Sequence, residues 1–579
     1  MSSTDAASAD PHAQTADLSR LGADPSGARV TSTELVGALI ERIAAVDAPD
    51  SPTALRAVLA LADDALDTAR ARDAERAAGR SRGPLHGVPV LVKDNIQAVG
   101  LPCTAGSASL LGRPVTVDAP LVARLREAGA VVLGATNLSE WANLRSTRSA
   151  SGWSGVGGLT GNPWALDRSA GGSSAGAGAA VAAGLAPLAV GTETNGSITC
   201  PAALNGVVGL KPTVGSIPGA GIVPLSRSQD TAGPMARSVR EAAVLFAVLS
   251  GRVDALRAGD PERARTMTVG VSAGLLTGDA ATDGLFSRTV DQVARVVAEV
   301  RDVDVPGPDG DVVTDQTSVL VAEHLDDLAA YLAERPGGGI RGIADVIAFD
   351  DANPELERAS MGQDLLQLAV DSGGRRGPSY RTARERNLQW ARSTLGAAFN
   401  AGVDVVIAPA YRPAWKSDLV HGDVLMGGGA VCTAPAILGW PILTVPMGLV
   451  GGLPVGLSIC GPAGSEDALL AIGQAVEDAL GLVAGTGDGL PRGTTVAGVE
   501  VGGMSETEAV ATLTKALGAQ AKAPIPATVN GDAVSIAPES AGLSFDAEAT
   551  VAGLSGRIWN PVTLLSQFTG GPVLDPVVD

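Results

Sequence analysis

Residues 85–96 read LHGVPVLVKDNI, with an apolar run at 88–92. A short run of this kind, without polar alternation, is typical of a strand buried on both faces of a sheet. A similar run at 130–133 follows a helical pattern at 121–128, which Gly129 is placed to end. Helices that alternate with buried strands predict an α/β fold, in which one central sheet carries helices on both faces.

Two helices are expected before this stretch. Thr31 and Glu34 have the spacing of a capping box, and apolar residues follow at helical spacing up to Val46. A second helix, rich in Ala, Arg and Asp, is predicted at 53–79. Residues 1–28 are interpreted as a flexible leader.

Later segments are expected to complete the sheet. Apolar runs at 403–409, 442–446 and 453–459 predict three further strands. Residues 255–400 are more helical and more charged, and we interpret them as an insertion that shapes the mouth of a site. The sequence therefore predicts one large domain over 29–484 with a mixed central sheet.

The remaining residues, 485–579, are expected to form a small α+β domain after a Gly-rich linker at 484–489. A strand is predicted at 496–501, followed by a capped helix that extends to Leu517. Asn530-Gly531 lies between β-prone runs, which is a strong hairpin signal.

Composition limits the classes of partner. The 579 residues include 62 acidic and 42 basic side chains, a net charge of −20 that would repel a phosphate backbone. Nucleic acid is therefore not an expected partner. The segment between Arg168 and Glu193 has no charge, but its Gly, Ala and Ser content and Pro187 predict a buried helix and turn rather than a membrane span.

The four cysteines show no CxxC spacing, so neither a zinc ribbon nor a disulfide framework is expected. We predict buried free thiols in a reducing compartment. The first 20 residues are polar and acidic and lack the features of a secretory signal. The predicted location is the cytoplasm.

Two Gly-rich turns carry the densest chemical signal, GGSSAGAG at 171–178 and GTETNGSITCP at 191–201. Successive backbone N–H groups in such turns can bind an oxyanion, and a serine at the edge can attack the carbonyl. The alternatives are a phosphate-binding loop and glycines that only permit tight packing. No GxxxxGK[ST] is present, which disfavours nucleotide binding.

A serine nucleophile needs a base, and the chain has only four His and five Lys residues. His86 is interpreted as a structural loop residue. Lys93 ends the apolar run, where burial would lower its pKa and leave a neutral amine near pH 7. The alternative is a buried Lys93 paired with Asp94 or another acid.

Residues 83–240 resemble the amidase signature family, and weaker similarity extends over about 28–480. The pieces that match in order and spacing are Gly83-Pro-Leu-His-Gly-Val-Pro89, Lys93-Asp-Asn95, Thr136-Asn137, Asn162-Pro-Trp164, Gly171-Gly-Ser-Ser174, Gly191-Thr-Glu-Thr-Asn-Gly-Ser-Ile198, Pro201-Ala202, Gly206-Val-Val-Gly-Leu-Lys-Pro-Thr213, Asp230 and Gly233-Pro-Met-Ala-Arg237.

The resemblance implies an amide hydrolase with a Ser–Ser–Lys triad and no metal or organic cofactor. Ser197 would be the nucleophile, Ser173 the bridging residue, which the family holds through a cis peptide bond, and Lys93 the base. The resemblance places the oxyanion and substrate-binding groups at Thr194, Asn195, Gly196 and Ser174, together with the N–H of Ser197.

Within the family, the pieces at 137–143 and 151–154 resemble the peptide amidases, which release ammonia from the C-terminal amide of peptides. Ala175 and Asn195 depart from the usual family residues. Thr199 stands where many relatives carry an Arg that binds an acidic substrate, which argues against a malonamate-type substrate. A peptide or small-molecule amide is the expected substrate.

Two other functions stay open: an amidotransferase subunit that makes glutaminyl- or asparaginyl-tRNA, and an envelope-binding protein with a secondary amidase domain. The second rests on residues 490–579, which resemble a repeat of actinobacterial envelope proteins associated with peptidoglycan binding. Peptidoglycan is thus a predicted partner of the tail, unless the tail is an inert module. The oligomeric state is not predicted.

Overall fold

The computed structural model describes residues 30–48, 51, 54–252, 260–356, 361–423, 427–481, 495–496, 499–500, 506–521, 525–529 and 532–536. By its internal contacts the chain divides into two units, Met1–Ala484 and Gly485–Asp579. The predicted leader and Gly-rich linker lie outside the described residues, as do most of the tail residues that carry the envelope-protein resemblance.

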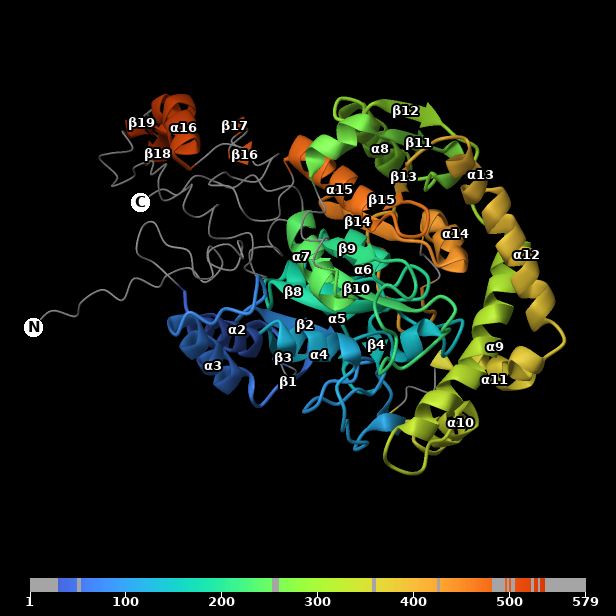
Figure 1. The fold of residues 1–579 in the computed structure, drawn as a ribbon. Helices are drawn as coiled ribbons and strands as arrows, with labels where there is room; N and C mark the ends of the chain where they lie inside the picture. Colours follow the sequence, from blue (N-terminus) through green and yellow to red (C-terminus); the bar gives the residue numbers. More distant parts are fainter. Residues whose placement is uncertain are drawn as a thin grey trace, which may run out of the picture. The chain divides into compact units, whose positions relative to one another are not determined.

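The described residues of the first unit form a mixed eleven-stranded sheet (Figure 1) in the order β1-β3-β2-β8-β10-β9-β14-β15-β13-β11-β12. Parallel pairs join β3, β2 and β8 and also β13, β11 and β12, whereas the centre is antiparallel. The strands are β1 (Val58–Leu61), β2 (Pro89–Lys93), β3 (Val131–Thr136), β8 (Leu188–Glu193), β9 (Val208–Lys211), β10 (Thr231–Ala236), β11 (Thr268–Val271), β12 (Glu299–Asp302), β13 (Val405–Pro409), β14 (Ile442–Val450) and β15 (Leu453–Cys460).

Helices cover both faces of this sheet, as predicted. A Cβ on Gly456 of β15 would meet Thr444 and Ala203 of α6, whereas a Cβ on Gly473 of α15 would meet Leu443. Because successive strand residues point to opposite faces, α6 and α15 lie on opposite sides of β14. The helices are α2 (Ser32–Val46), α3 (Ala65–Ala77), α4 (Pro120–Glu127), α5 (Ala175–Ala182), α6 (Thr199–Asn205), α7 (Val239–Ser250), α8 (Ala280–Val293), α9 (Gly310–Glu334), α10 (Ile343–Ala352), α11 (Asp364–Ser372), α12 (Tyr380–Ser393), α13 (Leu395–Asn400), α14 (Ala430–Leu438) and α15 (Glu466–Leu480).

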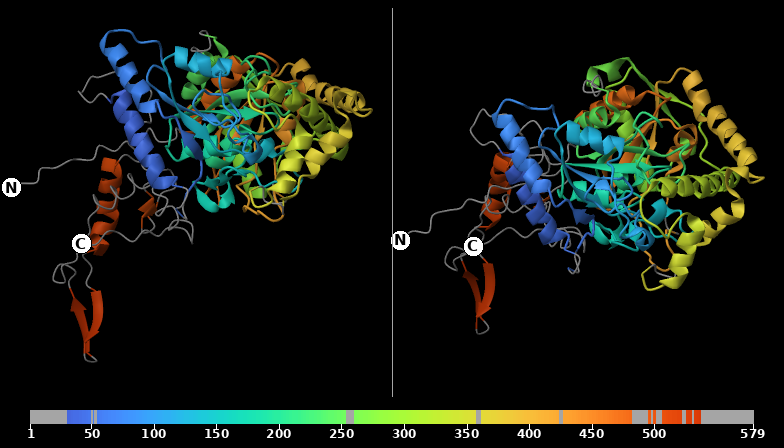
Figure 2. Two further views of the ribbon diagram at one scale, coloured as in Figure 1. Left: turned by 90° about the horizontal axis from the view of Figure 1, so that it is seen from below. Right: turned by 60° about the horizontal axis from the view of Figure 1, so that its bottom comes forward.

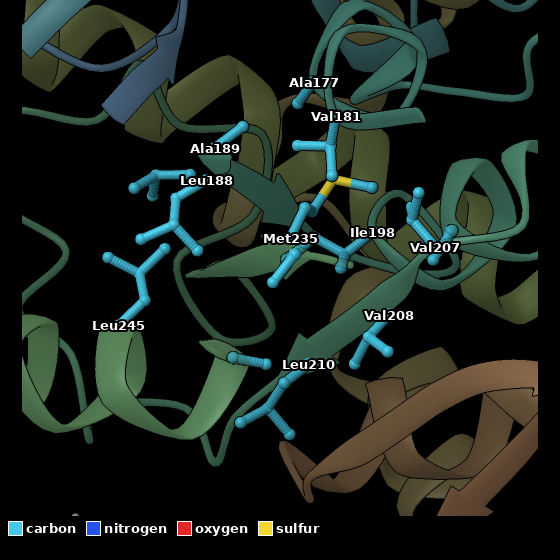
Figure 3. Close-up of a cluster of buried hydrophobic side chains, with 14 of the residues drawn as sticks. Ala177, Val181, Leu188, Ala189, Ile198, Val207, Val208, Leu210, Met235 and Leu245 are labelled. Carbon is cyan, nitrogen blue, oxygen red and sulfur yellow. The ribbon is translucent and has the colours of Figure 1, made fainter. Parts of the chain in front are cut away.

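The core around the middle of the sheet is built from small and branched side chains. Figure 3 shows Val181 of α5, Leu188 of β8, Met235 of β10 and Leu245 of α7 in one buried cluster. Every residue of α5 is buried, and Gly176 lets this helix approach so closely that a Cβ there would lie 2.4 Å from a backbone oxygen. The uncharged segment is therefore a buried helix, as predicted.

No helix within the described ranges is long and apolar enough to cross a membrane.

The amino-terminal prediction is half correct. Thr31 and Glu34 form the expected capping box at the start of α2. The helix predicted at 53–79 is wrong in its first part, because the edge strand β1 pairs there with β3 and α3 begins only at Ala65. Pairing of the apolar residues 58–61 with a sheet edge outweighs the helical propensity of Ala and Leu.

The segment predicted as a helical insertion is mostly helical, and Figure 2 shows α9–α12 gathered on one side of the sheet. It also contributes β11, which pairs in parallel with β13, and β12, which pairs in parallel with β11. The segment is therefore partly an integral portion of the sheet, because β11 can pair with β13 only once the chain is folded.

The second unit contains α16 (Glu506–Ala521) and two hairpin-like pairs, β16 (Thr495–Val496) with β17 (Val499–Glu500) and β18 (Ile525–Val529) with β19 (Asp532–Ile536). The single strand predicted at 496–501 is wrong, since two shorter strands occupy this stretch. The antiparallel β18–β19 pair flanks the predicted Asn-Gly turn, whose two residues lie outside the described ranges.

Candidate active site

Three strands bring polar residues to one edge of the sheet. β2 and β8 are parallel neighbours, so Lys93 and Glu193 end their strands at the same edge. β10 runs antiparallel to β8 and pairs Thr231 with Glu193, which places Asp230 at this edge as well.

The two Gly-rich turns meet above this edge. Ser173 and Ser174 directly precede α5, Ser197 lies just before α6, and the backbone N–H of Ser174 donates to the carbonyl of Ser197 at 3.0 Å. The Gly172–Ser173 peptide bond is cis. A Cβ on Gly172 would lie 2.2 Å from the hydroxyl of Ser139, so only glycine fits this approach.

Lys93 is fully buried among oxygen atoms. Its Nζ lies 2.8 Å from Ser173 Oγ, 2.9 Å from Ser174 Oγ, 2.9 Å from Thr192 Oγ1 and 3.2 Å from the Thr192 carbonyl. The carboxylate of Asp94 instead accepts from the backbone N–H groups of 103 and 104. The alternative in which Asp94 pairs with Lys93 is therefore wrong.

The environment of Lys93 favours a neutral amine that faces Ser173. Burial lowers the pKa of Lys93 to about 7, and the charges of Glu193 and Asp230 oppose this shift. Ser174 Oγ donates to the Thr192 carbonyl at 3.0 Å and accepts from the Thr192 N–H at 3.2 Å, so its proton is already engaged. A neutral amine can give its two N–H groups to Ser174 and Thr192 and direct its lone pair at the hydroxyl of Ser173.

The turn before α6 leaves a row of backbone donors open. In the described part of the chain, no hydrogen bond is donated by the N–H groups of residues 194–197. The next two amides, of Ile198 and Thr199, donate to the carboxylate of Glu193 at 2.7 and 2.9 Å. Residues 194–197 therefore include four backbone donors without an acceptor in the described ranges, the N–H of Ser197 among them, and groups of this kind can bind an oxyanion.

The structure brings all the predicted site residues to one place, but it does not join all of them directly. Within the described residues, no hydrogen bond connects Ser197 Oγ with Ser173 Oγ, and the two turns are linked through Ser174. Ser197 is 8% exposed and Ser173 is fully buried. Of these two serines, Ser197 is thus the one that a substrate can reach.

The other titratable candidates lie in structural environments. His86 contacts the carbonyl of Arg72 at 2.9 Å, as its interpretation as a loop residue predicted. His324 packs against Trp141, and burial lowers its pKa to about 4. All four cysteines are buried and free. Burial raises the pKa of the Cys432 thiol to about 12, far from a reactive thiolate.

Among the described residues, no group of three or more His, Cys, Asp or Glu side chains could hold a metal ion.

Sequence reasoning missed three residues at the site. Thr192 contacts Lys93, and Asp230 accepts a hydrogen bond from Thr194 at 2.5 Å. Tyr411 lies against Gly196, where a Cβ would come within 2.5 Å of its hydroxyl. Asp230 belongs to a recognised motif piece without an assigned role, whereas nothing in the sequence links position 411 to the turn.

A family model described as Amidase matches residues 34–470. The solved structure of native peptide amidase from Stenotrophomonas maltophilia matches with a TM-score of 0.73 and 41% sequence identity, over 80% of this chain and 96% of that chain. An amidase family protein from Bacillus anthracis matches with a TM-score of 0.71 and 29% identity, over 81% and 92% of the two chains.

Curated relatives include a glutamyl-tRNA(Gln) amidotransferase subunit from Symbiobacterium thermophilum, 35% identical over 471 residues, which are 77% of this chain and 93% of that protein. The corresponding protein from Acidothermus cellulolyticus is 37% identical over 486 residues, covering 78% of this chain and 91% of that protein.

Proposed function

The chain belongs to the amidase signature family and is a hydrolase of C–N amide bonds, and from this premise we propose that it deamidates the C-terminal amide of peptides through a Ser197–Ser173–Lys93 triad. The observation that carries the proposal is the buried environment of Lys93, which lowers its pKa to about 7 and places Nζ 2.8 Å from Ser173 Oγ.

The proposed mechanism starts with neutral Lys93. Ser197 Oγ loses its proton to Ser173 Oγ, whose own proton passes to Nζ of Lys93, and Ser197 Oγ forms a bond to the amide carbon. The open N–H groups at 194–197 hold the resulting oxyanion. Removing one such donor in comparable enzymes costs about 10²- to 10³-fold in rate.

The proton then returns from Lys93 through Ser173 to the leaving nitrogen. The C–N bond breaks, ammonia departs, and the acyl group stays on Ser197 as an ester. Water attacks the ester by the same relay: one of its protons moves through Ser173 to Lys93 while the new C–O bond forms. Cleavage of the ester returns that proton through Ser173 to Ser197 Oγ and releases the carboxylic acid, which then ionises to the carboxylate.

The peptide-amide substrate class rests on two supports. The matched peptide amidase is 41% identical over nearly its whole length. Position 199, just after the nucleophile turn, is a threonine whose hydroxyl contacts Glu193 at 3.2 Å, so it offers no cation for an acidic substrate.

The test is ammonia release by the purified chain from C-terminally amidated peptides and from simple carboxamides. We expect release from the peptides with higher kcat/KM, and none by the Ser197→Ala variant. Full turnover by Ser197→Ala would exclude the proposed nucleophile, and a preference for simple carboxamides would exclude the substrate class.

A second candidate follows from two of the curated relatives, which are amidotransferase subunits with 35% and 37% identity. In that case the chain would release ammonia from glutamine only when partner subunits are present. Ammonia from a peptide amide with the purified chain alone excludes this candidate, and the net charge of −20 also disfavours a tRNA-linked role.

The compartment and the tail carry finer proposals. The four free buried cysteines support a cytoplasmic location. Peptidoglycan is the proposed partner of residues 490–579 by resemblance alone. Sedimentation of the full chain with purified cell walls tests it, and failure to co-sediment would remove peptidoglycan as a partner.

A further inference from the structure

Asp230 holds the first residue of the open turn. Its Oδ1 accepts the hydroxyl proton of Thr194 at 2.5 Å, and its Oδ2 accepts the backbone N–H groups of Leu225 and Ser226, each at 2.8 Å. A hydroxyl that donates to a carboxylate at this distance makes a strong, charge-assisted hydrogen bond. The side chain of Thr194 is therefore tied to the turn at 225–230.

The turn at 225–230 is itself anchored by α9. Ser226 Oγ donates to Glu323 at 2.7 Å, and the backbone N–H of Arg227 donates to Asp327 at 2.9 Å. Arg375 bridges these two acids, at 2.8 Å from Asp327 and 3.4 Å from Glu323. A continuous chain of hydrogen bonds thus runs from α9 through Asp230 to Thr194.

The open donors at 194–197 are held at both ends by acids. Asp230 holds Thr194 at the beginning, and Glu193 holds the amides of Ile198 and Thr199 just past the end. Donors stabilise an oxyanion only when they are oriented before the reaction, because reorientation during the reaction would cost free energy. Release of either end would allow these peptide planes to turn.

We propose that Asp230 is a positioning residue of the amidase: through the hydroxyl of Thr194 it holds the oxyanion-binding turn in its active orientation. The proposal rests on the proposed function, since the turn binds an oxyanion only if Ser197 is the nucleophile. Asp230 itself contacts no reacting atom in this scheme and acts through Thr194.

The test is a double-mutant cycle with Thr194→Val, Asp230→Asn and the double variant. Thr194→Val removes only the hydroxyl, and we expect kcat to fall about 10- to 100-fold with little change in KM, as for a misoriented oxyanion donor. The kcat of Asp230→Asn should fall at least as far, because the turn at 225–230 also loses a carboxylate oxygen that accepts its backbone N–H groups. The double variant should be no slower than Asp230→Asn, since both changes break one hydrogen bond.

Losses that multiply in the double variant would overturn the proposal, because they would show that the two residues act independently. An unchanged kcat in Thr194→Val would do the same. The matched control is Thr282→Val, which removes another buried threonine hydroxyl that donates to an aspartate, Asp279 at 2.7 Å, at the start of α8. This variant should keep full activity.

A fluorophosphonate probe separates this inference from the proposed function. The probe reacts with an activated serine and needs the oxyanion-binding turn, but it needs no amide substrate. If Ser197 is labelled while no amide is hydrolysed, the substrate proposal fails and the labelling rates still decide the role of Asp230. If Ser197 is not labelled at all in the wild type, both proposals fail.

The pH profile separates the charge of Asp230 from its hydrogen bond to Thr194. Lys93 on β2 interacts with the charges of Asp230 and of Glu193 on β8. Asp230 interacts with the charge of Asp327 on α9. The charge of Asp230 raises the pKa of Lys93, but burial also raises the pKa of Asp230 itself to about 7, so this charge acts mainly above that pH. Asp230→Asn should therefore shift only the upper part of the acidic limb of kcat/KM, near pH 7, to lower pH, whereas Thr194→Val, which keeps the carboxyl group, should leave it in place.

Discussion

Two lysines at strand ends share nearly every property except their neighbours. Lys93 ends β2 and Lys211 ends β9, and both are fully buried. Burial lowers the pKa of Lys93 to about 7 and that of Lys211 to about 8. Lys93 has three hydroxyls and one carbonyl around its Nζ, whereas the hydrogen bond described for Lys211 goes to the carbonyl of Pro212 at 3.3 Å.

The difference shows that a lowered pKa does not by itself make a catalytic base. Both lysines can give up a proton near neutral pH. Only Lys93 lies beside a hydroxyl, that of Ser173, which can donate a hydrogen bond to the lone pair of the neutral amine. Position relative to the two Gly-rich turns is what separates a proposed base from a structural lysine.

The largest expected effect contrasts the two lysines directly. Lys93→Met should lower kcat/KM at least about 10³-fold, because the proposed base is lost and general acid–base catalysis contributes up to about 10⁴-fold. Lys211→Met should stay within about tenfold of the wild type, since it removes no group from the proton path. Ammonia release under identical conditions measures both.

Comparable losses in the two lysine variants would break the comparison, provided that circular dichroism shows both to be folded. In that case activity would depend equally on both buried lysines, and Lys93 would have no special role in catalysis.

The next effect separates the two hydroxyls beside Lys93. Ser173→Ala should lower kcat about 10²- to 10³-fold, because the proposed proton bridge is lost. Ser174→Ala should cost about tenfold, since the hydrogen bond to Lys93 that it removes is worth about 1.4 kcal/mol and its two bonds to Thr192 lie outside the proton path. Burst kinetics with an activated ester compare the two variants. Equal losses would contradict the assignment of Ser173 as the bridge.

The pH dependence of activity should report Lys93. Acylation needs its neutral form, so kcat/KM should rise with pH through about 7 and be about 100-fold lower at about pH 5 than on the plateau. Lys211→Met should leave this limb in place. A limb that disappears in Lys211→Met would identify Lys211 as the titrating group instead.

The smallest effect concerns stability. The pKa of Lys211 falls from 10.5 to about 8 on folding, so the unfolded chain binds more protons between these values, and stability from this group rises with pH across that window. The expected contribution is about 3 kcal/mol. Lys211→Met should flatten the curve of unfolding free energy against pH between about 8 and 10 in urea titrations. An unaltered slope would show that Lys211 keeps its proton when folded.

Much of the fold was readable from local patterns. The apolar runs at 88–92 and 442–446 are strands, and the Thr31–Glu34 capping box begins a helix, because these signals act over a few residues. The strands β1 and β11 were not predicted, since four-residue runs become strands only when a strand from a distant part of the chain pairs with them.

The site divides in the same way. The sequence by itself determined which residues are available: serines in Gly-rich turns and a lysine at the end of an apolar run, whose burial lowers its pKa. It did not determine which groups surround that lysine, because Ser173 and Thr192 lie 80 and 99 residues away from it.

The family resemblance implied that Lys93 acts with Ser173, but only the tertiary structure decided that the Lys93 amine lies 2.8 Å from Ser173 Oγ, and that Asp230 reaches Thr194. The physical reason is that hydrogen-bond geometry and burial depend on distances between segments that the sheet order brings together, and no local pattern encodes those distances.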